Sequence, residues 1–348
     1  MLKPYSRAEL SFSLDNEIGH EGKNSQVYMA HDPQLDADLV YKKIQKSDFS
    51  GRDEYFVESG VLYQSSHPNV VPIHYSCEDD DNVYIAMPYY SNGSLNQLIN
   101  NRFLTVREII RYASQFISGL HNIHSKRLIH FDVKPDNILI SDQGEALLSD
   151  FGLTKQMALN GYVGQDRMYG KMAPPEAYVK AEYTTAFDIY QTGLTLYRMC
   201  VGNEEFYHQF NTYGDQANFD RDSFKFDVTN GRFPDRNNFP PHIPRRLINV
   251  VKKCLNPDPD ERYTAAIHIV NDLAVIDGNT LDWQYSHTDE GICKWSKVSD
   301  DREYELIINV DGTSAAKKIF DTGREQRIRD CCQDKMTDRD VRRFLGGY

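Results

Sequence analysis

One stretch, "HFDVKPDNILI" at residues 130–140, restricts the possible structure of this chain more than any other part of it. It places Asp132, Lys134 and Asn137 at short fixed offsets, directly ahead of an apolar run. A second apolar run, "ALLSDFG", contains Asp150, about 18 residues after Asp132. The two runs are typical of a short strand pair, which would bring Asp150 back beside Asn137. The pattern therefore predicts one site that collects two carboxylates, a lysine and an amide.

The segments around this stretch predict two regions of different structure. Short β-branched and aromatic runs between residues 12 and 90 are typical of strands, and "RDEYFVESGVLYQSS" among them has helical spacing. From about residue 94 the pattern turns helical, with Ser94 as an N-cap and with Thr105 and Glu108 as a capping box. Further helices are predicted in "TAFDIYQTGLTLYRMCVG", "IPRRLINVVKKCL" and "TAAIHIVNDLAVI". The first region is thus expected to be mainly β and the second mainly α.

Residues 281–348 differ from both regions. "CKWSKV", "YELIINV" and "AAKKIF" are typical of short strands, and "REQRIRDCCQDKMTDRDVRRFLG" is typical of one or two charged helices. Acidic and basic side chains nearly balance here, so the segment lacks the basic footprint of a nucleic-acid-binding module. We expect an appended module for substrate recruitment or regulation, with a packing extension against the larger region as the alternative.

Charge and cysteine content exclude several classes of protein. The formal net charge of -12 argues against general nucleic-acid binding and against attachment to an anionic membrane. The six cysteines form no CxxC pair, which favours reduced thiols over a zinc site or a disulfide framework. The N-terminus lacks the apolar core of a signal peptide, and no apolar run approaches the roughly 18 residues of a membrane span. We expect a cytoplasmic protein with no membrane contact, and the sequence predicts no oligomeric state.

Phosphoryl transfer is the chemistry that suits the residues around Asp132. It relies on a carboxylate that orients the acceptor hydroxyl, a second carboxylate and an amide that hold a metal ion, and a lysine that steadies the phosphates. The combination His-x-Asp-x-Lys-x-x-Asn, followed by Asp-Phe-Gly, resembles the eukaryotic-type (Hanks-type) serine/threonine protein kinases over roughly residues 12–275. This resemblance implies a bilobal α+β fold: a β-rich N-lobe with one regulatory helix (12–90), a mainly α C-lobe (91–280) and a small α+β C-terminal extension (281–348).

The resemblance also implies the roles of the residues in the opening pattern. Asp132 would orient the acceptor hydroxyl and take its proton, and Lys134 would steady the γ-phosphate of ATP. Asn137 and Asp150 would hold Mg²⁺. Every charged position of the family's catalytic pattern is filled in this sequence.

Binding of ATP is implied for a second set of residues. Lys42, in "LVYKKI", matches the lysine on the α- and β-phosphates, and Glu58 matches its partner on the helix. Met87 matches the gatekeeper, and Pro88 keeps only a carbonyl with which to bind adenine, since proline has no N–H. The remaining positions that match the nucleotide site are Gly19, Gly22, Val27, Val40, Tyr90 and Leu139.

Three further matches are structural rather than catalytic. "MAPPEAY" places Glu176 at the acid of the Ala-Pro-Glu segment, and "CLNPDPDERYT" places Arg262 where the family pairs an arginine with that acid. "TAFDIYQTG" places Asp188 where the family braces the backbone of the catalytic loop. Removing one partner of such a buried ion pair typically costs about 3–5 kcal/mol.

The chain departs from the family pattern at three places. Ser25 stands where a third glycine is usual in the phosphate-covering loop, and glycine best allows close backbone approach. Phe131 replaces the arginine that pairs with an activation-loop phosphate in many relatives, and no Ser or Thr lies between Thr154 and Thr184. Tyr169 stands where a threonine is usual, although Lys134 still favours Ser/Thr over Tyr as acceptor.

These observations predict an ATP- and Mg²⁺-dependent protein kinase that phosphorylates Ser/Thr hydroxyls of protein substrates without activation-loop phosphorylation. Apolar contacts of Phe131 would then hold the catalytic loop, and Tyr162 and Tyr169 are the loop hydroxyls that would test this idea. Two alternatives stay open at this stage. One is a pseudokinase that serves as a scaffold or binding module, and the other is a small-molecule phosphotransferase.

Overall fold

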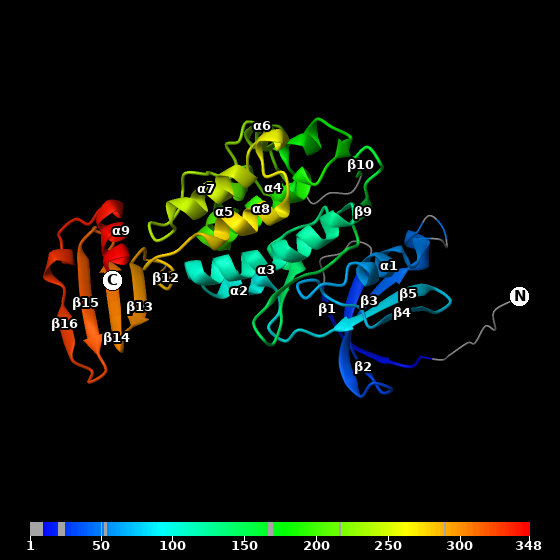
Figure 1. Ribbon diagram of the computed structural model, residues 1–348, viewed down its shortest axis with the longest axis horizontal. Coiled ribbons are helices and arrows are strands. Elements are labelled where there is room, and N and C mark those ends of the chain that lie inside the picture. Colours follow the sequence, from blue (N-terminus) through cyan, green and yellow to red (C-terminus); the bar gives the residue numbers. More distant parts are fainter. Residues whose placement is uncertain are drawn as a thin grey trace, which may run out of the picture.

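The N-lobe is built on an antiparallel sheet in the strand order β1-β2-β3-β5-β4 (Figure 1). The computed structural model describes residues 10–19, 25–49, 51, 54–165, 170–215, 217–288 and 290–348. Within these ranges, the strands of this sheet are β1 (Ser13–Gly19), β2 (Ser25–Asp32), β3 (Ala37–Gln45), β4 (Tyr75–Glu78) and β5 (Asn82–Pro88). The helix of this lobe, α1 (Val57–Gln64), lies in the segment whose spacing predicted it.

The register of the sheet gathers several nucleotide-site positions on one of its faces. Side chains along a strand alternate between the two faces, so Val40 and Lys42 share a face of β3. Val27 of β2 pairs with Lys42, and Met87 of β5 pairs with Val40, so both join that face. Tyr41 points to the opposite face. There it is fully buried in a separate hydrophobic cluster with Leu39 and Tyr84.

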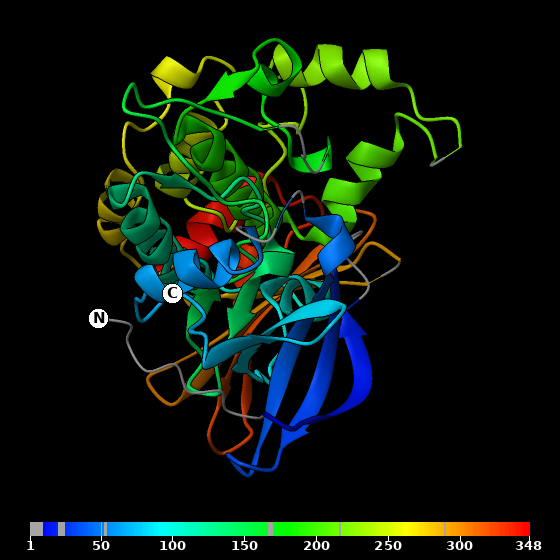
Figure 2. The same ribbon diagram turned by 90° about the vertical axis from the view of Figure 1, so that its right-hand side faces the viewer.

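The C-lobe is mainly helical (Figure 2). It supplies most of the residues of the largest hydrophobic core among the described residues. Helix α3 packs against α8, and α4 packs against α7. The predicted N-cap at Ser94 and the predicted capping box of Thr105 with Glu108 are confirmed, and Ser94 also forms a capping box with Gln97. The helices are α2 (Leu95–Asn101), α3 (Val106–Ser125), α4 (Ala186–Val201), α5 (Asn203–Asn211), α6 (Arg221–Thr229), α7 (Arg245–Cys254) and α8 (Ala266–Ala274).

Short strand pairs connect these helices and carry the opening sequence pattern. The antiparallel pairs are β6 (Leu128–Ile129) with β9 (Lys155–Gln156), β7 (Ile138–Ile140) with β8 (Ala146–Leu148), and β10 (Val163–Gly164) with β11 (Glu182–Tyr183). The predicted strand pair around the catalytic pattern is therefore confirmed as β7 and β8. The predicted bilobal α+β fold is also confirmed. Helices α5 and α6 had not been predicted.

Residues 281–348 form a separate antiparallel sheet covered by one helix, on the side of the C-lobe away from the N-lobe (Figure 1). Its elements are β12 (Gln284–His287), β13 (Cys293–Ser299), β14 (Arg302–Ile308), β15 (Ser314–Phe320), β16 (Glu325–Arg327) and α9 (Asp338–Gly347). The interpretation of "REQR" as the start of a helix was wrong. Gly323, at φ 75°, turns the chain back after β15, so this stretch pairs with β15 as β16.

This C-terminal module packs on the C-lobe through its first two strands and the residue Asp282 just before them. Arg107, at the start of α3, donates two hydrogen bonds to the Asp282 carboxylate, one of them 2.9 Å long. The Phe103 ring meets the Tyr285 ring edge-on at 4.8 Å between centroids. Trp295 is buried within the module and donates its indole N–H to His242 of the C-lobe at 3.3 Å. The module thus shares part of its core with the C-lobe.

Candidate active site

Lys42 lies at the meeting point of the two lobes, bonded to one carboxylate from each. Its Nζ is 2.7 Å from Oε1 of Glu58 on α1 and 2.8 Å from Oδ1 of Asp150 in the C-lobe. Burial alone would lower the pKa of Lys42, but the charges of Asp150 and Glu58 outweigh burial, so its pKa is raised. The Lys42 ammonium in turn holds the pKa of Asp150 well below its usual range. Both groups are therefore charged at neutral pH.

The catalytic loop is hydrogen-bonded to side chains near the N-terminal end of α4. The Asp188 carboxylate is fully buried and accepts the backbone N–H groups of His130 and Phe131, each at 2.8 Å. Gln191, one turn further along α4, accepts the N–H of Val133 at 3.0 Å and donates to the carbonyl of Phe131. Because buried backbone groups need partners, this pairing fixes the path of the loop.

Asp132, Lys134 and Asn137 come together within the loop. Lys134 Nζ is 3.0 Å from Oδ2 of Asp132, and Asn137 Nδ2 donates to the same oxygen at 2.8 Å. Burial lowers the pKa of Lys134, but the charge and hydrogen bond of Asp132, together with the charges of Asp150 and Asp136, outweigh burial and raise it. Oδ1 of Asp132 is buried and has no hydrogen-bond partner among the described residues. Such an oxygen is suited to accept a hydroxyl proton from an incoming substrate.

The side chains around Asn137 suit a hard divalent cation. Magnesium prefers oxygen ligands and is bound in phosphoryl-transfer sites by one or two protein groups plus phosphates. The hydrogen bonds that the Asn137 amide makes to described residues use its nitrogen, which leaves its oxygen available. The Asp150 carboxylate supplies a second oxygen donor. The described residues contain no cluster of three or more His, Cys, Asp or Glu side chains that could hold a metal ion.

The remaining nucleotide-site positions lie on both lobes. Val27, Val40 and Met87 share the sheet face of Lys42, and Pro88 ends β5. Tyr90 lies just beyond β5. Leu139 lies on β7 and forms an isolated bridge with Ser94 at the start of α2. Gly19 ends β1 opposite Val27, whereas Gly22 lies outside the described residues.

Glu176 and Arg262 form a buried bidentate pair at the far end of the activation segment. Both guanidinium N–H groups lie 2.7 Å from the two carboxylate oxygens, and both side chains are nearly inaccessible to solvent. Arg262 also donates to the carbonyl of Ala186 at the start of α4. The pair therefore ties the activation segment to the helix that carries Asp188. Tyr169, earlier in the same segment, lies outside the part of the chain that the structure describes.

Phe131 is buried although it lies next to catalytic Asp132. Its ring meets Phe187 at 4.9 Å and Tyr183 at 6.0 Å between centroids, both edge-on. Its φ of 66° is unusual for a bulky side chain. Packing from one side and hydrogen bonds to Asp188 and Gln191 from the other keep the residue in this conformation.

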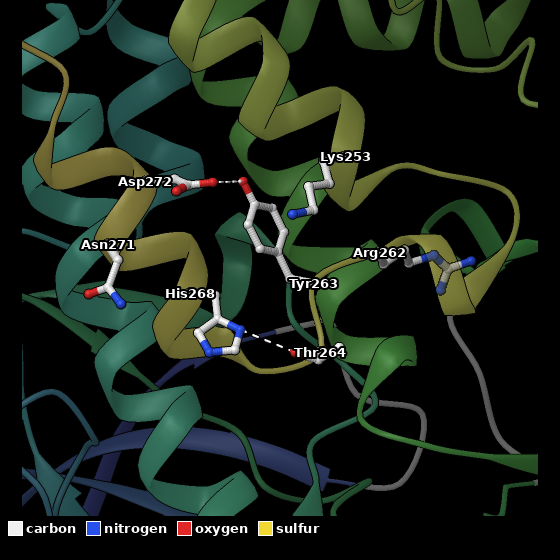
Figure 3. A pocket seen from close by; sticks show the side chains of 7 residues that line it. All are labelled: Lys253, Arg262, Tyr263, Thr264, His268, Asn271 and Asp272. Atoms are coloured by element: carbon white, nitrogen blue, oxygen red, sulfur yellow. Dashed lines mark hydrogen bonds between the residues drawn. The ribbon is translucent and has the colours of Figure 1, made fainter.

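A separate depression lies on the α7–α8 side of the C-lobe and is lined by none of the catalytic residues (Figure 3). Its polar groups largely pair with one another: Tyr263 donates to Asp272 at 2.6 Å, and Thr264 bonds the His268 ring at 3.1 Å. The Lys253 ammonium lies 4.1 Å from the centroid of the Tyr263 ring. These contacts assign the depression to packing between α7 and α8.

The sequence did not predict Gln191, His124 and Arg198, which contact the catalytic loop or the Asp188 carboxylate that holds it. Gln191 follows Asp188 by one helical turn, and this spacing was the available signal for it. His124 is 2.8 Å from the Asp188 carboxylate, and Arg198 is 3.7 Å from Asp136. No local pattern identifies these contacts, because the partners are far apart in the sequence.

Sequence comparisons with known proteins match the part of the chain that contains this site. The model of the protein kinase domain matches residues 12–272. A protein of Lactococcus lactis named probable serine/threonine-protein kinase PknB is 29% identical over 273 residues, which cover 76% of this chain and 41% of that relative. Serine/threonine-protein kinase PrkC of Bacillus subtilis is 27% identical over 259 residues, which cover 72% of this chain and 38% of the relative.

The match thus spans less than half of the length of these relatives. Among the described residues, no helix combines the length and apolar character needed to cross a membrane. The family match covers both lobes, including the pairing of Lys42 with Glu58 and the loop held by Asp188. The chain belongs to the protein kinase family.

Proposed function

We propose that this protein transfers the γ-phosphate of ATP, with Mg²⁺, to serine or threonine hydroxyls of protein substrates. The observation that carries the proposal is the assembly of Asp132, Lys134 and Asn137 on a loop held by Asp188. The Lys42–Glu58 pair completes the arrangement that phosphoryl transfer requires. The relatives that are named serine/threonine kinases, together with Lys134, support the choice of acceptor.

We further propose that activity does not depend on phosphorylation of the activation segment. The segment is held by strand pairing of β6 with β9 and of β10 with β11. Lys155 donates to the carbonyl of Gly164 at 3.0 Å, and Gln165 donates to that of Leu153 at 2.8 Å. Phe131 packs where a phosphate-reading arginine would otherwise stand. Contacts within the segment and the packing of Phe131 thus support this segment in place of a phosphate.

The test is a labelling assay on phosphatase-treated protein with labelled ATP, Mg²⁺ and a generic basic protein. Asp132→Asn keeps the shape of the side chain and removes the base. Asp142→Asn serves as the matched control, because Asp142 is exposed and its carboxylate accepts a hydrogen bond from Ser91. We expect label on serine or threonine, a rate roughly 10²- to 10⁴-fold lower in Asp132→Asn, and no change in the control.

Three outcomes would contradict the proposal in different ways. Label on tyrosine would overturn the acceptor class. Absence of both label and ATP binding would favour a scaffold role. Activity that appears only after phosphorylation of Tyr162 or Tyr169, as located by mass spectrometry, would overturn independence from loop phosphorylation alone.

A further inference from the structure

Lys171 is a half-buried cation beside the catalytic loop. It lies in the short helical turn Gly170–Met172, directly before the segment that Glu176 anchors. Its ammonium is 5.0 Å from the centroid of the Tyr207 ring and 4.8 Å from that of Phe210. Among the described residues, it has no carboxylate within ion-pair distance and donates no hydrogen bond.

A second cation lies beneath Lys171. Arg198 of α4 is 1% exposed, and its guanidinium carbon is 5.4 Å from the centroid of the same Tyr207 ring. Burial lowers the pKa of Lys171 and the Arg198 charge lowers it further, while Asp136 offsets only part of this effect. The cluster thus contains two cations and one carboxylate, and an added anion would stabilise it.

The partners of Arg198 show that it is fixed in place. It donates to Asn203 at 2.8 Å and to Asn96 at 2.7 Å, and it lies 3.7 Å from the Asp136 carboxylate. Arg198 is therefore a buried supporting charge. Lys171 differs, because its ammonium meets only the aromatic rings of Tyr207 and Phe210, and its N–H donors have no acceptor among the described residues.

The cluster lies beside the catalytic loop. Asp136, which lies between Lys134 and Asn137 in that loop, is 3.7 Å from Arg198 and its charge acts on Lys171. Because the same loop carries Asp132, the substrate side chains that Lys171 would meet are those near the acceptor hydroxyl. A carboxylate or phosphate there would gain a charge-assisted hydrogen bond that a neutral or basic side chain would not.

We infer that Lys171, supported by Arg198, is an anion-binding subsite that selects protein substrates with an acidic or already phosphorylated residue close to the acceptor. This inference rests on the proposed kinase function and adds a substrate class to it. It predicts a preference of roughly tenfold in kcat/KM for such substrates, the size expected of one charge-assisted hydrogen bond.

The experiment uses the full chain and a set of serine peptides that differ at one position. In each peptide Glu, Gln, Lys or phosphoserine is moved residue by residue along both sides of the acceptor. Lys171→Met keeps a stem that packs on the aromatic rings, and Lys171→Arg restores the charge. Lys180→Met is the matched control, because Lys180 is exposed and lies beyond Glu176 in the same segment. The ratio of kcat/KM values within one variant does not depend on how much of that variant is folded.

The wild type and Lys180→Met should prefer Glu or phosphoserine over Gln at one or two positions. Lys171→Met should lose this preference, and Lys171→Arg should regain it. A preference for Glu without phosphoserine, or the reverse, would identify which anion the subsite accepts.

Equal rates for Glu and Gln at every position in the wild type would overturn the inference while the kinase function stands. A preference for Glu or phosphoserine over Gln that survives in Lys171→Met would also overturn the inference about Lys171. Absence of Asp132-dependent label on every peptide would overturn the proposed function and the inference together.

Discussion

Phe131 stands where the family pattern often has an arginine, and it has a structural role of its own. A bulky side chain at a positive φ is strained, so the surrounding contacts must offset the cost. They do so from two sides, through aromatic rings and through hydrogen bonds to the backbone from α4. The side chain thus supports the catalytic loop by packing rather than by charge.

Phe131→Ala should lower the free energy of unfolding by about 3–5 kcal/mol, because it leaves a cavity in a fully buried aromatic cluster. Phe226→Ala, on an exposed face of α6, is the control and should change it by about 0.5 kcal/mol or less. Urea unfolding followed by far-ultraviolet circular dichroism measures both. Equal losses in the two variants would show that Phe131 does not support the lobe.

At the scale of the elements, Gly119 allows helix α3 to pack closely against the backbone of Asn69. A Cβ at Gly119 would come within 2.3 Å of the backbone carbonyl oxygen of Asn69. That oxygen already accepts the N–H of Leu148, so it cannot move freely. The glycine therefore sets the distance between α3 and the segment that leads into the N-lobe sheet.

Two glycine-to-alanine changes in helices should have opposite signs. Gly119→Ala should destabilise the protein by about 1–3 kcal/mol, because the added methyl group overpacks the contact with Asn69. Gly60→Ala, in α1, meets no atom within 4 Å and should stabilise the protein by about 0.5–1 kcal/mol through helix propensity. Thermal unfolding of the two variants, compared with wild type, provides the measurement. A stabilising effect at Gly119 would contradict the close contact between α3 and Asn69.

At the scale of the whole molecule, His242 joins the C-lobe to the C-terminal module. Its ring is 1% exposed, lies 4.9 Å from the Tyr285 ring and accepts the indole N–H of Trp295. Burial lowers the pKa of His242 to about 3. Both tryptophans of the chain, Trp283 and Trp295, lie in this module, so tryptophan fluorescence reports on its unfolding.

Acid should therefore weaken the attachment of the module. In the unfolded chain the imidazole titrates near pH 6.5, and in the folded chain near pH 3. Between these values the unfolded state binds more protons, so stability is complete above about pH 6.5 and falls by about 1.4 kcal/mol per pH unit below it.

His242→Gln should remove about 2 kcal/mol of the loss of stability between about pH 7 and about pH 5. His208→Gln, at an exposed position on α5, should leave the loss unchanged. Urea unfolding followed by tryptophan fluorescence at the two pH values tests this. The same pH dependence in His242→Gln and wild type would contradict a neutral His242 at the junction.

Much of the fold and of the site followed from short sequence patterns. The N-cap at Ser94 and the capping box at Thr105 were predictable because the interacting groups lie within one helical turn. The strand pair around Asp150 was predictable because a short turn joins its strands. The β16 strand was mistaken for a helix because it pairs only with β15 in the sheet, and that pairing depends on the turn at Gly323.

The sequence by itself determined which side chains the catalytic loop offers, since Asp132, Lys134 and Asn137 lie within six consecutive residues and a loop of that length can bring them together. Only the tertiary structure decided which residues from distant segments contact the site. Lys42 meets Asp150 although they are 108 positions apart, because the sheet register and the packing of the lobes bring them together. The same holds for Arg198 beneath Lys171. Contacts between distant segments depend on how whole elements pack, and no local pattern encodes that packing.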